Sequence, residues 1–459
     1  MRRRFRAAAR RTFHSLRVRN YRLYFVGQIV SLSGTWMQSV AQAWLVLKLT
    51  GSGVALGIVT ALQFLPILLA GPWGGVVADR VDKRRLVAVT QNVAGLLALA
   101  LGVLTVTGVV SLWQVYLIAF LLGCVNLVDM PARQSFVMEM VGREDLPNAV
   151  SLNSVVVNAA RIVGPAVAGL LIATVGIGIC FLLNAASYIA VIMAFVAMRP
   201  AELFRGIPVP RKKGQLREGL RYVWSHEELR VPLLLMAVVG TLAYNFSVVF
   251  PLLVRETFHS GAGTYGVLYS VMGAGAVVGG LLVASRSSAT RPLLAVATFA
   301  FGATLLVAAV MPQLWAEVVV MLPVGAASTA FIATSNALLQ LGSSAEMRGR
   351  VMALFSVVFL GSTPIGGPLI GWIAEAGGPR AALGVGAIAT LAVGAAALVG
   401  VRRLRRSRRA EEVARSQAVA AAAALAAEEP APLLTGPAAR SSGRSGSRSG
   451  GRSRPAARR

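Results

Sequence analysis

Long runs of apolar residues, separated by short polar connections, occupy most of the 459-residue chain. Each run is about 20 residues or longer, which is the length that crosses the hydrocarbon core of a bilayer as an α-helix. The pattern therefore predicts an all-α polytopic membrane protein with twelve transmembrane helices. The predicted spans are residues 23–48, 54–78, 86–109, 112–130, 149–174, 177–198, 230–254, 264–285, 292–311, 314–340, 350–374 and 380–401.

A polar, basic segment at residues 199–229 separates six predicted spans from the other six. Its second part, from residue 215, is amphipathic and is predicted to lie at the membrane interface. The segment "NAVSLNSVVVNAARIVGPAVAGLLI" is echoed about 200 residues later by "RVMALFSVVFLGSTPIGGPLIGWI", which indicates an internal repeat. The predicted domains are a basic N-terminus (1–22), a first six-helix bundle (23–198), a central loop (199–229), a second six-helix bundle (230–401) and a disordered basic tail (402–459).

Composition supports the membrane class, because only 14% of the residues are charged, against about 25% in a soluble domain. The net charge of +27 is concentrated at the two ends: residues 1–22 carry nine Arg and no acid, and residues 402–459 carry fourteen Arg against four Glu. Basic connections stay on the cytoplasmic side of a membrane, so both termini are expected there. The basic ends are expected to attract anionic lipid. No nucleic-acid recognition motif accompanies the charge, and no nucleic-acid partner is predicted.

The sequence offers no catalytic or metal-binding pattern. Cys124 and Cys180 lie inside apolar runs, and the three histidines are far apart. No Walker-type Gly-Lys-Ser/Thr sequence is present. We therefore expect no enzyme activity, no cofactor and no metal site.

The stretch "GGVVADRVDKRR" places a dense group of charges between the second and third predicted spans. Gly75 and Asp79 fall on one face at the end of the second span, followed by Arg80, Lys83 and Arg84. A glycine there permits another helix to approach closely, and the aspartate can meet the positive N-terminus of that helix. Arg and Lys alone serve topology, whereas the aspartates do not. A topological signal alone therefore does not account for the whole stretch.

This stretch resembles the signature between helices 2 and 3 of the major facilitator superfamily, although Asp82 stands where the family often has glycine. The sequences "FHSLRVRNYRLYFVGQIVSLSGTWMQSVAQAWLVLKLTGS" and "VDMPARQSFVMEMVGREDLPNAVSLNS" resemble its bacterial branch of transmembrane secretion effectors, which includes siderophore exporters and macrolide-efflux-like proteins. The resemblance covers roughly residues 13–400. It implies two pseudo-symmetric six-helix bundles in a bacterial cytoplasmic membrane.

The resemblance also implies that residues 75–84 form a conformational latch together with Asp129, the alternative being a topological signal only. Asp79 would dock on the start of helix 11, near residues 350–354, and lock the outward-facing state. Arg80 or Arg84 would pair with an acid at the end of helix 4, for which Asp129 is the candidate.

A second signature lies in the fifth predicted span, where Gly164, Pro165 and Gly169 resemble the helix-5 signature of the family's antiporters. Glycine and proline permit close packing and a bend in a membrane helix.

Ionisable residues inside predicted spans are functional candidates by default. Asp129, Arg161 and Glu317 are the candidates for proton coupling. For Asp129, pairing within a latch would explain the acid equally well. Arg161 could stabilise a buried acid, bind an anionic substrate or serve a structural role. A candidate substrate cavity is formed by Thr35, Gln38, Gln42, Asn158 and Asn245, and hydrogen bonds between helices are the alternative for these residues.

The favoured function is a proton-coupled exporter of a lipophilic or amphiphilic small molecule, such as a drug, siderophore or secondary metabolite, working by alternating access. An importer or facilitator of the same fold is the first alternative. A non-transporting membrane scaffold is the second, and deletion of residues 410–459 would discriminate between them, because a transporter should largely survive it.

Overall fold

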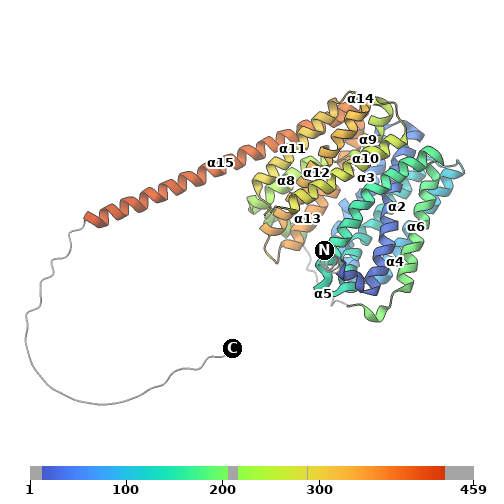
Figure 1. The fold of residues 1–459 in the computed structure, drawn as a ribbon, viewed down its shortest axis with the longest axis horizontal. Coiled ribbons are helices and arrows are strands. Elements are labelled where there is room, and N and C mark those ends of the chain that lie inside the picture. The colour runs from blue at the N-terminus through green and yellow to red at the C-terminus, as the bar shows by residue number, and fades with distance from the viewer. Residues whose placement is uncertain (1–12, 205–214, 287, 429–459) are drawn as a thin grey trace, which may run out of the picture. The chain divides into compact units, whose positions relative to one another are not determined.

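The computed structural model describes residues 13–204, 215–286 and 288–428. Contacts divide the chain into one unit up to Arg402 and another from Arg403 onward. Figure 1 shows the helices of the first half, in blue to green, grouped beside those of the second half, in yellow to orange. The elements of the first half are η1 (His14–Arg17), α2 (Arg19–Thr50), α3 (Gly53–Arg80), α4 (Lys83–Val106), α5 (Leu112–Thr174) and α6 (Ile177–Ala197).

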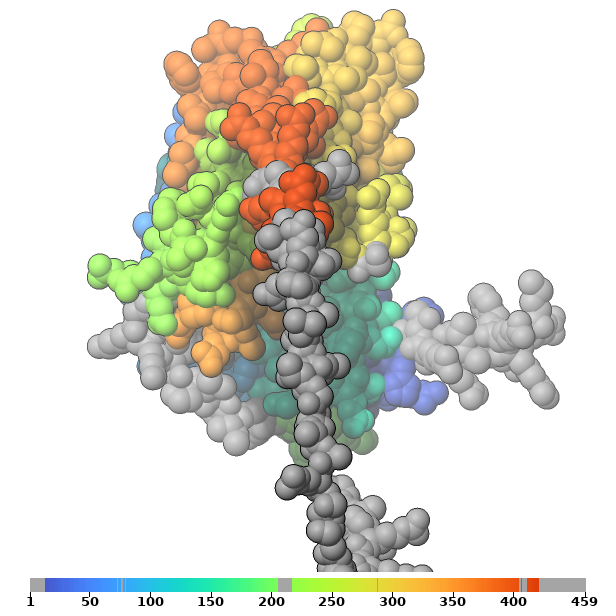
Figure 2. Space-filling model, turned by 90° about the vertical axis from the view of Figure 1, so that its left-hand side faces the viewer, coloured from blue at the N-terminus to red at the C-terminus, as the bar shows by residue number. Residues whose placement is uncertain are grey.

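The segment between the halves contains two short helices, η2 (Pro200–Glu202) and α7 (Gln215–Ser225). On the face seen in Figure 2, α7 and α8, in green, lie against α13, in orange. The elements of the second half are α8 (Glu227–Leu242), α9 (Phe246–Leu252), the π-helical turn η3 (Leu253–Thr257), α10 (Ala262–Ala284), α11 (Arg291–Val310), α12 (Leu314–Gly342), α13 (Arg348–Gly361), α14 (Thr363–Gly377) and α15 (Pro379–Glu428).

Helix α5 contains both the fourth and the fifth predicted spans. Its 63 residues would extend about 95 Å at 1.5 Å per residue, roughly three times the hydrocarbon thickness. The chain turns at Gly142, whose φ of 73° is a left-handed conformation that glycine adopts without a steric penalty. Helix α5 therefore crosses the membrane twice, and the predicted connection between residues 130 and 149 is itself largely helical.

Ten of the described helices are long and apolar enough to cross a membrane. Helix α5 is one of these ten but supplies two crossings. Helix α2, whose arginines and glutamines lower its hydropathy, packs against α5 and α6 and supplies another. The broken helices α8–α9–η3 and α13–α14 form one crossing each. The predicted architecture of twelve helices in two six-helix bundles is confirmed.

The two bundles meet most closely at one end, which we call the far end and define by the connections at residues 51–52, 258–261 and 378. There α3 packs on α14, and α5 packs on α10. A Cβ on Gly53 would lie 2.8 Å from the carbonyl oxygen of Gly371, and one on Gly57 would lie 2.6 Å from the carbonyl carbon of Gly367. These glycines allow the two backbones to touch. The opposite end, which carries the basic connections, is called the charged end.

The C-terminal part differs from the sequence-based expectation. A disordered segment was predicted from residue 402, but α15 continues to Glu428. The segment is rich in Ala, Arg and Glu, which favour helix even without tertiary contacts. Residues 429–459, the remainder of the predicted disordered tail, lie outside the described residues.

Candidate functional site

Asp129 lies in the interior of the first bundle, where three side chains bind its carboxylate. Its exposed fraction is 1%. The Thr90 hydroxyl and the Gln91 amide of α4 donate to Oδ1, at 2.5 and 3.1 Å. Arg133, one helical turn further along α5, donates through Nε to Oδ2 at 2.5 Å, and it also donates to the side-chain oxygen of Gln28 on α2, at 2.7 Å. The arrangement fits an ionised carboxylate, which only accepts hydrogen bonds.

A polar cavity of about 270 Å³ surrounds this pair. We call it the amide cavity, because side-chain amides supply most of its polar lining. Two buried amide atoms in it, Gln28 Nε2 and Gln91 Oε1, have no hydrogen-bond partner among the described residues. Water or a polar ligand group could bind at both atoms. The polar residues that line it are Gln28, Thr35, Gln38, Ser39, Gln42, Gln63, Gln91, Asn126, Asp129, Arg133, Gln134, Asn153 and Asn184.

The amide cavity brings together three of the five residues predicted for a substrate cavity, Thr35, Gln38 and Gln42. Gln38 also accepts a hydrogen bond from Asn184 of α6 at 2.6 Å, so helix–helix bonding and cavity lining coexist there. The structure places Asn158 and Asn245 outside this cavity. Asn158 donates to the Ser154 carbonyl of its own helix, and Asn245, 2% exposed, lies at the break between α8 and α9.

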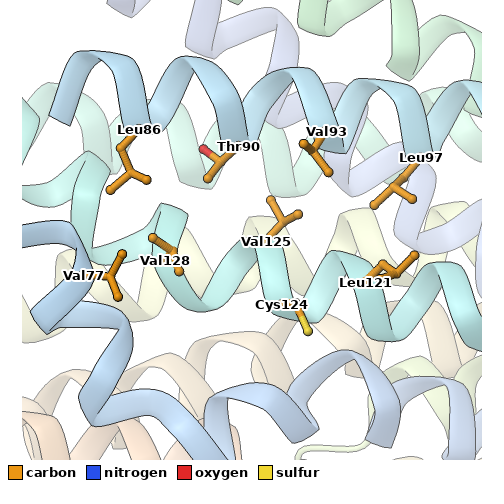
Figure 3. A pocket seen from close by; sticks show the side chains of 9 residues that line it. All are labelled: Val77, Leu86, Thr90, Val93, Leu97, Leu121, Cys124, Val125 and Val128. Carbon is orange, nitrogen blue, oxygen red and sulfur yellow. The ribbon is translucent and has the colours of Figure 1, made fainter. Parts of the chain in front are cut away.

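A second, apolar groove of about 380 Å³ lies between α3, α4 and α5. Aliphatic side chains and Cys124 form most of its wall. Thr90 carries the one hydroxyl group among the side chains labelled in Figure 3. That hydroxyl binds Asp129, so Thr90 lies between the apolar groove and the amide cavity. The lining residues are Val77, Leu86, Thr90, Val93, Leu97, Leu121, Cys124, Val125 and Val128.

The cations of the predicted latch have partners other than the expected one. Lys83 forms an ion pair with Glu139 of α5, with Nζ and Oε1 2.7 Å apart. Arg84 donates to the carbonyl oxygen of Phe195 at the end of α6, at 2.6 Å. The expected pairing of Arg80 or Arg84 with Asp129 is therefore not made in this structure, because Arg133 occupies that carboxylate from the same helix.

Asp79 and Asp82 are the two acids of the predicted latch. Asp82 caps α4, since its Oδ1 accepts from the Arg85 amide at 3.0 Å. Asp79 lies in the last turn of α3, but its side chain is outside the described residues. The tightest packing of α3 on α5 occurs at Gly74, next to Gly75, where an added Cβ would collide with the Leu127 backbone. The latch remains a prediction.

The residues of the predicted helix-5 signature lie where the second crossing of α5 packs against α2 of its own bundle and α10 of the other. A Cβ on Gly164 would lie 2.6 Å from the Trp36 Cβ of α2, and one on Gly169 would lie 3.1 Å from Gly263 of α10. The Pro165 carbonyl faces Gly266, also on α10. Side chains larger than hydrogen at these glycines would separate the helices.

Arg161 and Glu317 are the other ionisable candidates. The Arg161 guanidinium lies over the Trp36 ring, 5.1 Å from its centroid. Glu317, in the first turn of α12, has an exposed fraction of 0%, and neither of its carboxyl oxygens has a hydrogen-bond partner among the described residues. The neighbouring cation is Arg380 of α15, which donates to the Met311 carbonyl at 2.6 Å.

Sequence reasoning missed several partners in this site. Arg133 follows Asp129 by four residues, a spacing that places both on one helical face, and this signal was available. Thr90, Gln91 and Gln28 are far away in sequence, and only the packing of α2, α4 and α5 shows that they contact this pair. In the part of the chain that the structure describes, no group of His, Cys, Asp or Glu is arranged to hold a metal ion.

Two pseudo-symmetric six-helix bundles that pack closely at the far end, with a polar cavity and an ion pair inside the first bundle, define a membrane transporter of the major facilitator type. The profile of the transmembrane secretion effector family matches residues 10–430. The chain therefore belongs to this family.

Individual relatives agree with this assignment. The chain is 25% identical to the staphyloferrin A transporter of Staphylococcus aureus over 57% of this chain and 66% of that protein. It is 28% identical to the multidrug efflux pump Tap of Mycolicibacterium fortuitum over 76% of this chain and 88% of Tap. The fold is similar to that of a bacterial homologue of the human lysosomal transporter Spinster, solved in an inward-facing, unoccupied conformation. The TM-score is 0.64 and the identity is 14%, with 83% of this chain and 95% of that chain covered.

Proposed function

We propose that this transporter is a proton-coupled exporter of a lipophilic or amphiphilic small molecule, such as a drug, siderophore or secondary metabolite. The observation that carries the proposal is the ion pair of Asp129 with Arg133 inside the amide cavity. A multidrug efflux pump among its relatives supports export, and the apolar groove beside Thr90 suits a lipophilic solute.

Protonation of Asp129 would remove the charge that holds Arg133. The neutral acid would also need an acceptor for its own proton, because a protonated carboxyl group donates as well as accepts. Arg133 would then be released from Asp129 while it still contacts Gln28 of α2. A single proton would thus alter contacts among α2, α4 and α5, which is the kind of local charge event that shifts a conformational equilibrium.

Alternating access requires that the path between the two bundles closes at one end while it opens at the other. Close packing of the bundles at the far end, at Gly53 against Gly371 and at Gly57 against Gly367, supports a conformation closed there. Transition to the opposite state would bring the charged ends together. The stretch from Gly75 to Arg84 is then the proposed latch, in which Asp79 contacts the start of α13.

The proposed location is the bacterial cytoplasmic membrane, with both termini on the cytoplasmic side. The basic connections at the charged end support this orientation through the distribution of Lys and Arg. Anionic lipid is the proposed partner of the basic termini.

The test uses everted membrane vesicles that contain the protein and hold a proton gradient reported by a pH-sensitive dye. Lipophilic drugs and siderophores are added one at a time, and proton release is recorded. We expect release with at least one compound for the wild type and at least a tenfold smaller rate for Asp129→Asn. Glu144→Gln removes an exposed acid from the same helix and should behave as the wild type.

The outcomes separate the parts of the proposal. Substrate flux without proton release for any compound would overturn proton coupling and favour a facilitator. Release that is lost in Asp79→Asn but retained in Asp129→Asn would support the latch and move the proton site away from Asp129.

A further inference from the structure

Arg161 places a positive charge at the boundary between the two bundles. It lies in the second crossing of α5, and its guanidinium lies over Trp36 of α2. Helix α10 of the other bundle approaches the same turn. The Ser270 hydroxyl donates to the Ile162 carbonyl at 2.8 Å, and a Cβ on Gly273 would lie 3.2 Å from the Arg161 carbonyl oxygen.

The surroundings of this cation are aromatic and come from both bundles. Tyr269 of α10 directly precedes Ser270, whose hydroxyl donates to the carbonyl of Ile162, the residue after Arg161. Tyr269 packs edge-on against Tyr265 at 5.5 Å between ring centroids, and Tyr265 stacks on Trp44 of α2 at 6.1 Å. Aromatic rings thus continue from the first bundle to the second beside Arg161.

Arg161 has no anionic partner in the part of the chain that the structure describes. Among the described residues no carboxylate forms an ion pair with Arg161, and its Nε is buried without a hydrogen-bond partner. A charged group within a membrane span is unfavourable unless it is paired or hydrated. The interaction with the Trp36 ring is worth about 0.5–2 kcal/mol, and the Arg161 side chain is only partly buried, so its terminal nitrogens are not enclosed by the protein. The guanidinium therefore retains donors for an oxyanion, whose geometry it matches.

We propose that Arg161 binds an anionic group, such as a carboxylate, of the transported molecule. The apolar or aromatic body of that molecule would lie against Trp36 and Tyr269. This inference rests on the proposed function, since it adds a substrate class to the exporter. Because the site has residues from both bundles, its occupation would be sensed by both halves of the protein.

The test measures binding to the purified protein in nanodiscs of neutral lipid, by energy transfer from tryptophan to pyrene. The probes are 1-pyrenebutyrate, which carries a carboxylate, and 1-pyrenebutanol, its uncharged analogue, with empty nanodiscs as the background. We expect the wild type to bind the carboxylate at least tenfold more tightly than the alcohol. Arg161→Gln should bind the two probes about equally tightly, and Arg161→Lys should keep part of the preference for the carboxylate.

Arg255→Gln is the matched control, because Arg255 also lies between the bundles but donates to the backbone carbonyl of Leu47, at 2.6 Å. It should keep the wild-type preference. A wild type without preference, or without binding of 1-pyrenebutyrate above the background, would overturn the inference, as would an unchanged preference in Arg161→Gln. Equal weakening of both probes in Arg161→Gln would assign a structural role and also overturn it. Binding needs no proton gradient, so failure of proton coupling is a separate result.

Discussion

Asp129 in the first bundle and Glu317 in the second are both almost completely buried, but their surroundings differ. Asp129 accepts hydrogen bonds from Thr90, Gln91 and Arg133 within a polar cavity. The Glu317 carboxyl group has no hydrogen-bond partner among the described residues, although Arg380 is the nearby cation. An ionised carboxylate is tolerated in an apolar interior only when it is paired and hydrogen-bonded. The first bundle therefore offers a site for a charge, and the second a site for a neutral acid.

The largest effect is expected for Asp129→Asn. The substitution leaves the Arg133 guanidinium without its counter-ion, and removing one partner of a buried pair is strongly destabilising. Because the Arg133 side chain is 21% exposed, we expect a loss of about 2–3 kcal/mol in the free energy of unfolding. Thermal unfolding of the detergent-solubilised protein measures it.

The double variant Asp129→Asn/Arg133→Gln is the control for this prediction. It removes both charges and should recover at least half of the lost stability, because no unpaired charge remains. If Asp129→Asn unfolds at the wild-type temperature, the ion pair does not distinguish the first bundle from the second.

A smaller effect is expected for Thr90→Val, which keeps the side-chain shape but removes one of the two donors to Asp129 Oδ1. The loss of one hydrogen bond to a charged group should lower the free energy of unfolding by about 1–2 kcal/mol. Thr298→Val in the second bundle is matched to it, since Thr298 is also buried but donates only to the Leu294 carbonyl of its own helix. Equal losses in the two variants, again by thermal unfolding, would show that Thr90 contributes nothing specific to Asp129.

The smallest effect is expected for Glu317→Gln. Neither carboxyl oxygen accepts a hydrogen bond from a described residue, and the amide has the same volume, so stability should change by less than about 0.5 kcal/mol. The same unfolding measurement checks it, beside Asp129→Asn. A loss comparable to that of Asp129→Asn would mean that Glu317 is held as an anion by Arg380, and the contrast between the bundles would disappear.

Much of the architecture could be predicted from sequence because it depends on one-dimensional properties. The length of an apolar run decides whether a helix crosses a bilayer, and the basic segment at residues 199–229 divided the crossings into two sets of six. The first part of the predicted disordered tail is helical instead, because its composition suits both a solvated tail and a helix. Its local helix propensity favours the helix, which continues as far as Glu428.

The sequence by itself determined the class of protein, the twelve crossings and the short set of ionisable residues inside them, including Asp129, Arg161 and Glu317. Only the tertiary structure decided what surrounds each of them. The rotation of a helix about its axis and its crossing angle with its neighbours are not written in an apolar run. They place Gln28 beside Arg133 and Trp36 beside Arg161, and they leave the Glu317 carboxyl group without a hydrogen-bonding partner among the described residues. Three ionisable residues that the sequence places in apolar spans thereby lie in three different chemical environments.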